Sequence, residues 1–157
     1  MNIQPGRLIL LDTSVVVHLA RRDSTGQEIE QKFGLTGRAE RPLISTVTEG
    51  ELLGLAKYWK WGKAKIGILN AIMDELVRVE ASHREIIEIY AELYAEGRSN
   101  GLPCGENDLW IAATAKAANA VLLTCDNHFD WLHSRHITRI YMPEAPKQSE
   151  SAPQNEG

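Results

Sequence analysis

The sequence predicts an α/β fold, a three-layer α/β/α sandwich whose central parallel sheet has four to five short strands. Short apolar runs alternate along the chain with segments of helical periodicity, as expected when strands and helices build a parallel sheet. The length of 157 residues and the 43% of hydrophobic residues fit one domain with one core. We therefore expect a single domain over residues 1–143.

The first strand and the first two helices follow from local patterns. Residues 7–11 (RLILL) are a short apolar run, typical of a buried strand. The next letters, DTS, are residue types that begin helices, and VVVHLA continues at helical length. Residues 24–33 are typical of a polar surface helix.

The middle of the chain repeats the order of strand and helix. Residues 42–45 (PLIS) predict a second short strand, and Ser45 or Thr46 begins a helix that runs to about residue 59. Residues 63–76 place apolar side chains at three- and four-residue spacing, which predicts a helix facing the core.

The second half continues the alternation. The remaining expected strands are 77–79, 120–124 and 138–142, and the remaining expected helices are 82–98, 107–119 and the short 126–133. The run AVLLT at 120–124 is the clearest strand in the chain.

The composition limits the classes of protein to which this chain can belong. No segment has the length and apolarity of a membrane span or the form of a secretory leader, so we expect a cytoplasmic protein that does not enter membranes. Two distant cysteines indicate no disulfide framework. Residues 144–157, rich in Pro, Ser and Gln, predict a disordered polar tail that carries half of the net charge of −4.

Two aspartates follow predicted strands. Asp12 ends the first apolar run and Asp126 follows the best strand by two positions. Ligands gather at the carboxyl ends of strands in open parallel sheets, so both side chains belong on that rim. Helix capping explains each of them about equally well when it is taken alone.

Two further acids lie at positions of predicted helices. Glu51 shares a helical face with Val47, Leu55 and Tyr58, and a carboxylate within an apolar stripe is costly unless it is paired or bound to a cation. Asp108 lies in the first turn of its helix, where the helix dipole alone could account for a negative charge.

The four acids together predict a metal site. Carboxylates about 4 Å apart repel by about 4 kcal/mol per pair at an effective dielectric constant near 20, so a cluster needs a cation. Oxygen ligands without cysteine or paired histidine favour Mg²⁺ or Mn²⁺. Such ions activate water and stabilise a leaving oxygen, which makes phosphodiester hydrolysis the natural chemistry. The sequence holds no nucleotide-binding or serine-hydrolase motif.

Three blocks, LDTSVVVHL, ISTVTEGELLGLAK and NDLWIAATAKAANAVLLTCDNHF, resemble the PIN-domain ribonucleases, and most of all the VapC toxins of bacterial toxin–antitoxin pairs. The likeness runs from Leu8 to about Met142 with matching order and spacing. It implies a PIN-like fold, RNA cleavage with Mg²⁺ or Mn²⁺, a small antitoxin that inserts a basic side chain into the acidic pocket, and a homodimer.

The resemblance also assigns residues. It matches the family's metal-binding acids to Asp12, Glu51, Asp108 and Asp126. It places hydroxyl groups near the metal at Thr13 or Ser14 and at Thr124, for which helix capping and strand-end packing are equally plausible roles.

The segment YWKWGKAK mixes aromatic and basic residues, which suits stacking on RNA bases and contact with phosphates. The candidate contacts are Lys57, Lys60, Trp61 and Lys63. The alternative, which we favour slightly, is a helix end with solvated lysines and tryptophans packed into the core or a dimer contact.

Two other functions remain open at this stage. A non-catalytic PIN-like module would bind RNA or protein and keep the acids as helix caps. A metal-dependent phosphatase or phospho-acceptor domain would use Asp12 as nucleophile, but the usual pattern places an acid at the position of Ser14.

Overall fold

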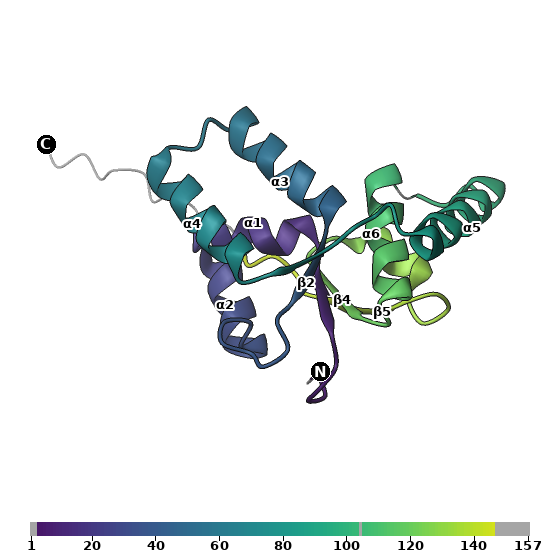
Figure 1. The fold of residues 1–157 in the computed structure, drawn as a ribbon, viewed down its shortest axis with the longest axis horizontal. Helices are drawn as coiled ribbons and strands as arrows, with labels where there is room; N and C mark the ends of the chain where they lie inside the picture. The colour runs from purple at the N-terminus through teal and green to yellow at the C-terminus, as the bar shows by residue number, and fades with distance from the viewer. Residues whose placement is uncertain (1–2, 104, 147–157) are drawn as a thin grey trace, which may run out of the picture.

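The computed structural model describes residues 3–103 and 105–146, and helices cover both faces of its central sheet (Figure 1). The sheet contains five strands: β1 Ile9–Leu11, β2 Leu43–Ser45, β3 Val77–Val79, β4 Val121–Thr124 and β5 Thr138–Tyr141. All neighbouring strands pair in parallel, in the order β3-β2-β1-β4-β5. The predicted sandwich with a parallel sheet is therefore confirmed.

The helices also lie where the sequence predicts them, with ends that differ by a few residues. They are α1 Thr13–Arg21, α2 Ser24–Phe33, α3 Thr46–Tyr58, α4 Lys63–Asp74, α5 Arg84–Asn100, α6 Glu106–Ala117 and the 3₁₀ helix η1 Asn127–Leu132. Capping sets several starts, since the side chains of Asp12, Asp23 and Ser45 accept backbone N–H groups of α1, α2 and α3.

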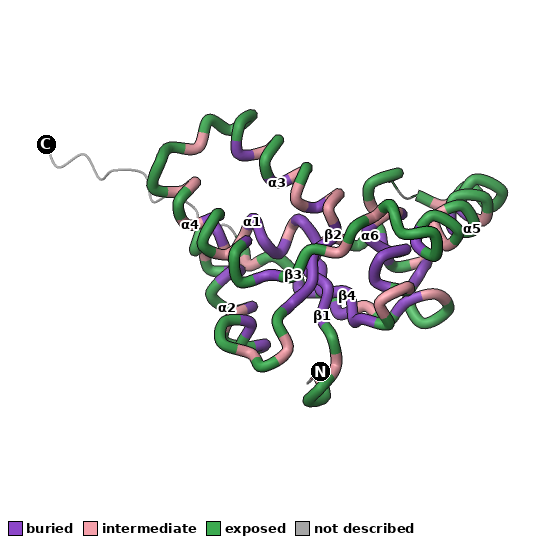
Figure 2. The backbone as a smooth tube through the Cα atoms, viewed as in Figure 1, coloured by how far each residue is buried: buried purple, intermediate pink, exposed green. Residues whose placement is uncertain are grey.

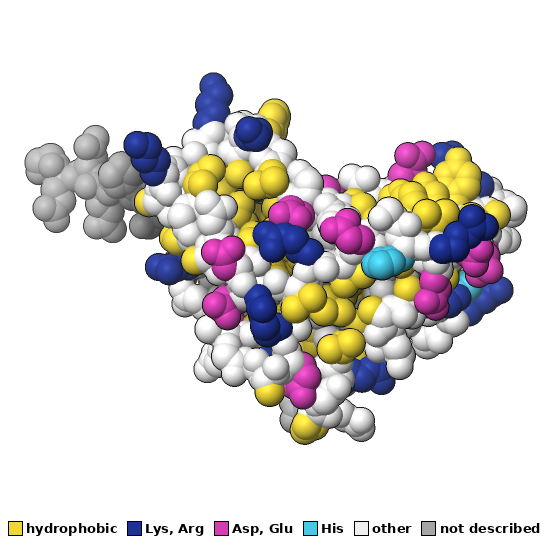
Figure 3. Space-filling model, in the orientation of Figure 1, with side chains coloured by type: hydrophobic (Ala, Val, Ile, Leu, Met, Phe, Trp, Pro, Cys, Tyr) yellow, Lys and Arg dark blue, Asp and Glu magenta, His cyan; other side chains and the backbone are white. Residues whose placement is uncertain are grey.

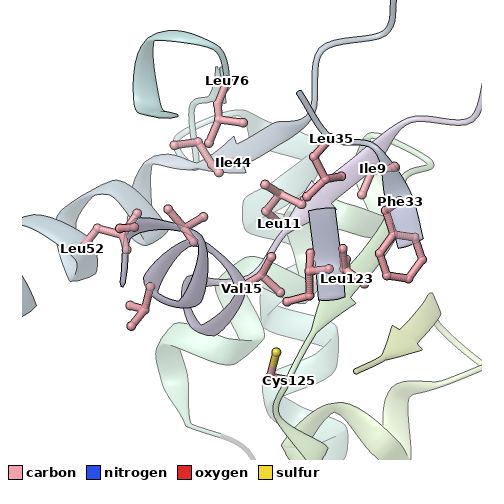
Figure 4. Close-up of a cluster of buried hydrophobic side chains, with 14 of the residues drawn as sticks. Ile9, Leu11, Val15, Phe33, Leu35, Ile44, Leu52, Leu76, Leu123 and Cys125 are labelled. Carbon is pink, nitrogen blue, oxygen red and sulfur yellow. The ribbon is translucent and has the colours of Figure 1, made fainter. Parts of the chain in front are cut away.

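Strands β1 and β4 are buried on both faces, which explains their continuous apolar runs. Alternate residues point to opposite faces, so Leu11 and Leu123 enter a core beneath α1, α2, α3 and α4, whereas Leu10 and Leu122 enter a second core beneath α5, α6 and η1. Figure 2 shows β1 and β4 buried at the centre, and Figure 4 shows Leu11, Leu123 and Val15 of α1 lying together in the first core.

The strand order reverses between β1 and β4. From β1 the chain proceeds through β2 to β3 on one side, and later strands β4 and β5 extend the sheet on the other side. Such a switch point opens a crevice at the carboxyl ends of the two central strands. Asp12 follows β1 and Asp126 follows β4 by two positions, so the topology puts both at this crevice.

The chain after β5 returns to the first two helices. The backbone N–H of Ala145 donates to Thr25 Oγ1 at 2.9 Å, and Glu144 Oε1 lies 3.3 Å from Nε2 of His18. The predicted disordered tail lies, from residue 147 onward, outside the described residues. No helix in the described part of the chain is long and apolar enough to cross a membrane.

Candidate active site

Asp12 is the most buried of the four acids, with 4% of its surface exposed. Its Oδ1 accepts the backbone N–H of Thr13 at 2.8 Å. Its Oδ2 accepts the hydroxyl groups of Ser14 at 2.8 Å and Thr124 at 2.7 Å. The carboxylate that caps α1 is thus also bonded to the end of β4, and three donors fix its orientation.

Glu51 approaches from α3. Its Oε1 accepts the hydroxyl of Thr13 at 2.8 Å, and its Oε2 accepts the side-chain amide of Asn107 at 3.3 Å. Thr13 therefore connects the carboxylates of Asp12 and Glu51 through its backbone N–H and its side-chain hydroxyl. The amide of Asn107 connects Glu51 to the start of α6.

Asp126 and Asp108 form the other side of the site. Asp126 caps η1 by accepting the N–H of His128 at 2.9 Å, and its own N–H donates to Thr124 Oγ1. Nδ1 of His128 lies 3.2 Å from Asp126 Oδ1 and 3.7 Å from Asp108 Oδ2. Thr124 therefore contacts both Asp12 and Asp126.

Burial and the charges of neighbouring carboxylates raise the pKa values of Asp108 and Asp12. Burial, together with the charges of Asp12, Asp126 and Glu51, raises the pKa of Asp108 to about 6, although nearby His128 acts in the opposite direction. Burial also raises the pKa of Asp12, although hydrogen bonds from Thr124, Ser14 and Thr13 oppose the change. The four acids, from four parts of the chain, therefore lie close enough for their charges to interact.

The donor set fits a hard divalent cation. Neither Lys nor Arg forms an ion pair with these four acids within residues 3–103 and 105–146, and His128 is their one basic neighbour there. Carboxylate oxygens are the ligands that Mg²⁺ and Mn²⁺ prefer. In the side-chain conformations of the described residues, however, no three acidic, histidine or cysteine groups are close enough to hold one ion.

The apolar stripe that was expected to contain Glu51 is not the buried face of α3. The buried residues of α3 are Thr48, Leu52 and Ala56, while Tyr58 is 80% exposed. Glu51 lies beside this stripe and is half-buried. The helix is rotated relative to the expected face because it packs against both α1 and α6.

Sequence reasoning missed two polar neighbours of the acids. Asn107 immediately precedes Asp108, and His128 follows Asp126 by two positions, so adjacency to a candidate ligand was the available signal. Neither belongs to a recognisable spacing pattern. Their approach to the acids depends on the geometry at the starts of α6 and η1.

The predicted RNA-contact segment lies at the corner between α3 and α4, where Figure 3 shows several basic side chains. Lys57, Lys60 and Lys63 are exposed. Trp61 packs partly against the first core, and its ring centroid lies 5.7 Å from that of Trp59. These features suit either interpretation of the segment, and an RNA contact stays a prediction.

Comparisons with known proteins agree with this architecture. The model of the PIN domain family matches residues 9–132. A protein of Haemophilus influenzae named Ribonuclease VapC1 is 27% identical over 117 residues, which cover 74% of this chain and 85% of that protein.

Solved structures share the fold. A chain in the complex VapBC2 from Rickettsia felis, bound to a DNA fragment from its promoter, superposes with a TM-score of 0.71 at 23% identity. The match covers 85% of this chain and 98% of that one. A chain of VapBC-1 from nontypeable Haemophilus influenzae gives a TM-score of 0.67 at 23% identity, with coverages of 86% and 98%. Since the family model spans most of the chain, from β1 to the end of η1, this protein belongs to the PIN domain family.

Proposed function

We propose that this protein is an endoribonuclease that depends on Mg²⁺ or Mn²⁺ and acts as the toxin of a toxin–antitoxin pair. The observation that carries the proposal is the arrangement of four acids at the switch point of the sheet. Thr13 and Thr124 link Asp12 to Glu51 and Asp126, and His128 lies between Asp126 and Asp108. Relatives named as VapC ribonucleases support RNA as the substrate.

The same four carboxylates would hold the cation. When bound, Mg²⁺ or Mn²⁺ would stabilise the negative charge that develops on the phosphodiester during cleavage and would make water a better nucleophile. The hydroxyl groups of Thr13, Ser14 and Thr124 orient these carboxylates by donating hydrogen bonds, from Thr13 to Glu51 and from the other two to Asp12. Asp108, with a pKa of about 6, holds a proton in mildly acidic solution in the metal-free protein, where an ordinary aspartate is ionised.

The partners follow from the relatives. Several similar chains were solved in VapBC complexes, which supports a small antitoxin as partner of this chain. Its basic side chain would neutralise the acidic crevice, which has one basic neighbour, His128, among the described residues. A homodimer, a cytoplasmic location and RNA contacts by Lys57, Lys60, Trp61 and Lys63 remain predictions.

The phospho-acceptor alternative is disfavoured by the surroundings of Asp12. A nucleophilic carboxylate must reach the phosphorus atom, but Asp12 is 4% exposed and both of its oxygens accept hydrogen bonds. The non-catalytic alternative predicts that Mg²⁺ or Mn²⁺ leaves the melting temperature unchanged and that Asp108→Asn has almost no effect on stability.

Cleavage of RNA tests the proposal. Purified protein is incubated with total cellular RNA and Mn²⁺ or Mg²⁺, beside an EDTA control and two variants of α3. Glu51→Gln removes a site carboxylate, whereas Glu49→Gln removes one that pairs with Arg78 outside the site. We expect discrete cuts by the wild type and by Glu49→Gln, and a loss of at least 100-fold in Glu51→Gln, an effect typical of removing one catalytic group. Equal cutting by both variants would refute the assignment.

A further inference from the structure

A cavity of about 920 Å³ opens beside the acidic crevice and runs along α1. Its lining begins at Thr13 and Ser14, the residues that bond Glu51 and Asp12, and reaches Arg21 and Arg22 at the other end of the helix. Arg21 follows Thr13 by eight positions in α1, so the two residues lie about 12 Å apart along the helix axis at about 1.5 Å per residue. The cavity therefore adjoins the proposed active site at Thr13 and Ser14 and is long enough for more than one nucleotide.

The charged groups of this cavity differ in their pairing. Its two carboxylates both meet His18, since Asp23 Oδ2 lies 2.7 Å from Nδ1 and Glu144 Oε1 lies 3.3 Å from Nε2. Arg21 and Arg22 form no ion pair with any carboxylate in the described residues. No carboxylate of the described residues therefore neutralises these two guanidinium groups, whereas the acids on the same wall are engaged by His18.

An aromatic surface accompanies these cations. Trp59 lines the cavity with 38% of its surface exposed, and the guanidinium carbon of Arg21 lies 4.4 Å from its ring centroid. Proteins bind single-stranded RNA by stacking bases on aromatic rings and guanidinium planes while basic side chains contact the phosphates. Arg21, Arg22 and Trp59 offer both kinds of contact.

We infer that this cavity is a binding site for single-stranded RNA, with phosphates contacted by Arg21 and Arg22 and a base stacked on the pair that Trp59 forms with Arg21. The inference rests on the proposed ribonuclease function and deepens it. The acidic crevice itself repels the RNA backbone, so affinity must come from neighbouring cations. The strand would pass from this site across Thr13 and Ser14 to the four carboxylates.

Binding is measured apart from cleavage, by fluorescence anisotropy of a fluorescein-labelled single-stranded RNA of 12 nucleotides in EDTA. The charge variant is Arg21→Gln with Arg22→Gln, and its control is Arg84→Gln with Lys116→Gln, two exposed residues away from the cavity. We expect the dissociation constant to rise at least tenfold in the charge variant alone. The slope of log Kd against log salt should fall by about 1.4, or about 0.7 for each lost phosphate contact.

The aromatic contact has its own matched pair. Trp59→Ala should weaken binding about five- to hundredfold, the range for a lost stacking interaction, whereas Tyr58→Ala should leave it unchanged. Tyr58 is the neighbouring aromatic residue, is 80% exposed and does not line the cavity. Thermal melting of each variant establishes that it is folded, and Arg21→Lys with Arg22→Lys should preserve the salt slope if the double Gln variant does not fold.

The outcomes separate the site from the function. The inference would be overturned if the double Arg variant and Trp59→Ala bind RNA with the Kd and salt slope of the wild type, even if Mn²⁺-dependent cleavage persists. That result would favour a peptide as the occupant of the cavity. Cleavage by a wild-type protein that shows no binding in low salt would overturn it as well. Loss of cleavage in the Glu51→Gln comparison bears only on the proposed function.

Discussion

Neutralising Asp108 should stabilise the metal-free protein. Its pKa is raised from 3.8 to about 6, so the folded state binds a proton more tightly than the unfolded state does. Between these two values the folded state holds more protons, and stability falls as the pH rises. A displacement of this size corresponds to about 3 kcal/mol at about 1.4 kcal/mol per pH unit. Solvent screening at a partly exposed carboxylate reduces the expected gain to about 1–2 kcal/mol.

The assay is thermal melting of Asp108→Asn and wild type in EDTA at pH 8 and at pH 4.5. At pH 8 the variant should melt about 2–8 °C higher, from about 2–4 °C per kcal/mol for a domain of this size. At pH 4.5 Asp108 is protonated in the folded wild type but still mostly ionised in the unfolded chain. About a third of the difference in stability between variant and wild type should therefore remain.

The matched control is Asp130→Asn, which removes the same charge from a side chain that is 59% exposed and pairs with Arg139 at 3.0 Å. That variant should gain no stability at either pH. The reasoning would be refuted if Asp108→Asn melts at or below the wild type at pH 8, or if its gain is the same at both pH values.

Three further predictions concern the cation, the packing of α2 and the cysteine beside the site. Saturating Mn²⁺ should raise the melting temperature of the wild type by several degrees and that of Asp108→Asn by less, because the variant has lost a ligand. Gly26→Ala should lower unfolding free energy by at least 2 kcal/mol in denaturant titrations, since the added Cβ would lie 2.3 Å from the carbonyl oxygen of His18. Gly50 lies within helix α3, and a Cβ added there would have no neighbour within 4 Å. Gly50→Ala should therefore raise the free energy of unfolding by up to about 1 kcal/mol. Burial raises the pKa of the Cys125 thiol to about 12, so in a Cys104→Ser background it should react with a thiol reagent at neutral pH far more slowly in the folded protein than after denaturation.

The strands could be predicted because their local signals agree with the tertiary structure. Strands β1 and β4 are buried on both faces, which requires uninterrupted apolar runs. The rim positions of Asp12 and Asp126 follow from these strands and from the parallel order. The fold and half of the acidic site were thus accessible from patterns a few residues long.

The rest of the site depends on contacts between distant segments. The face of α3 that is buried is set by its packing against α1 and α6, so the sequence pattern indicated the wrong stripe for Glu51. The hydrogen bond from Asn107 to Glu51 spans 56 positions, and no local rule indicates it. The cavity along α1 likewise combines α1, Trp59 after α3, and the chain after β5.

The hydroxyl groups around Asp12 explain how a charge-rich crevice coexists with a stable fold. Burying a carboxylate is unfavourable unless donors compensate it, and Thr13, Ser14 and Thr124 supply three hydrogen bonds. Two of these donors come from the first turn of α1 and one from the end of β4, so the carboxylate joins the elements on either side of the switch point. Among the described residues no hydrogen-bond donor reaches the carboxylate of Asp108. Nδ1 of His128 lies 3.7 Å from its Oδ2, and the pKa of Asp108 is raised to about 6. Burial and repulsion therefore act on Asp108 with little compensation, and a bound cation would relieve both.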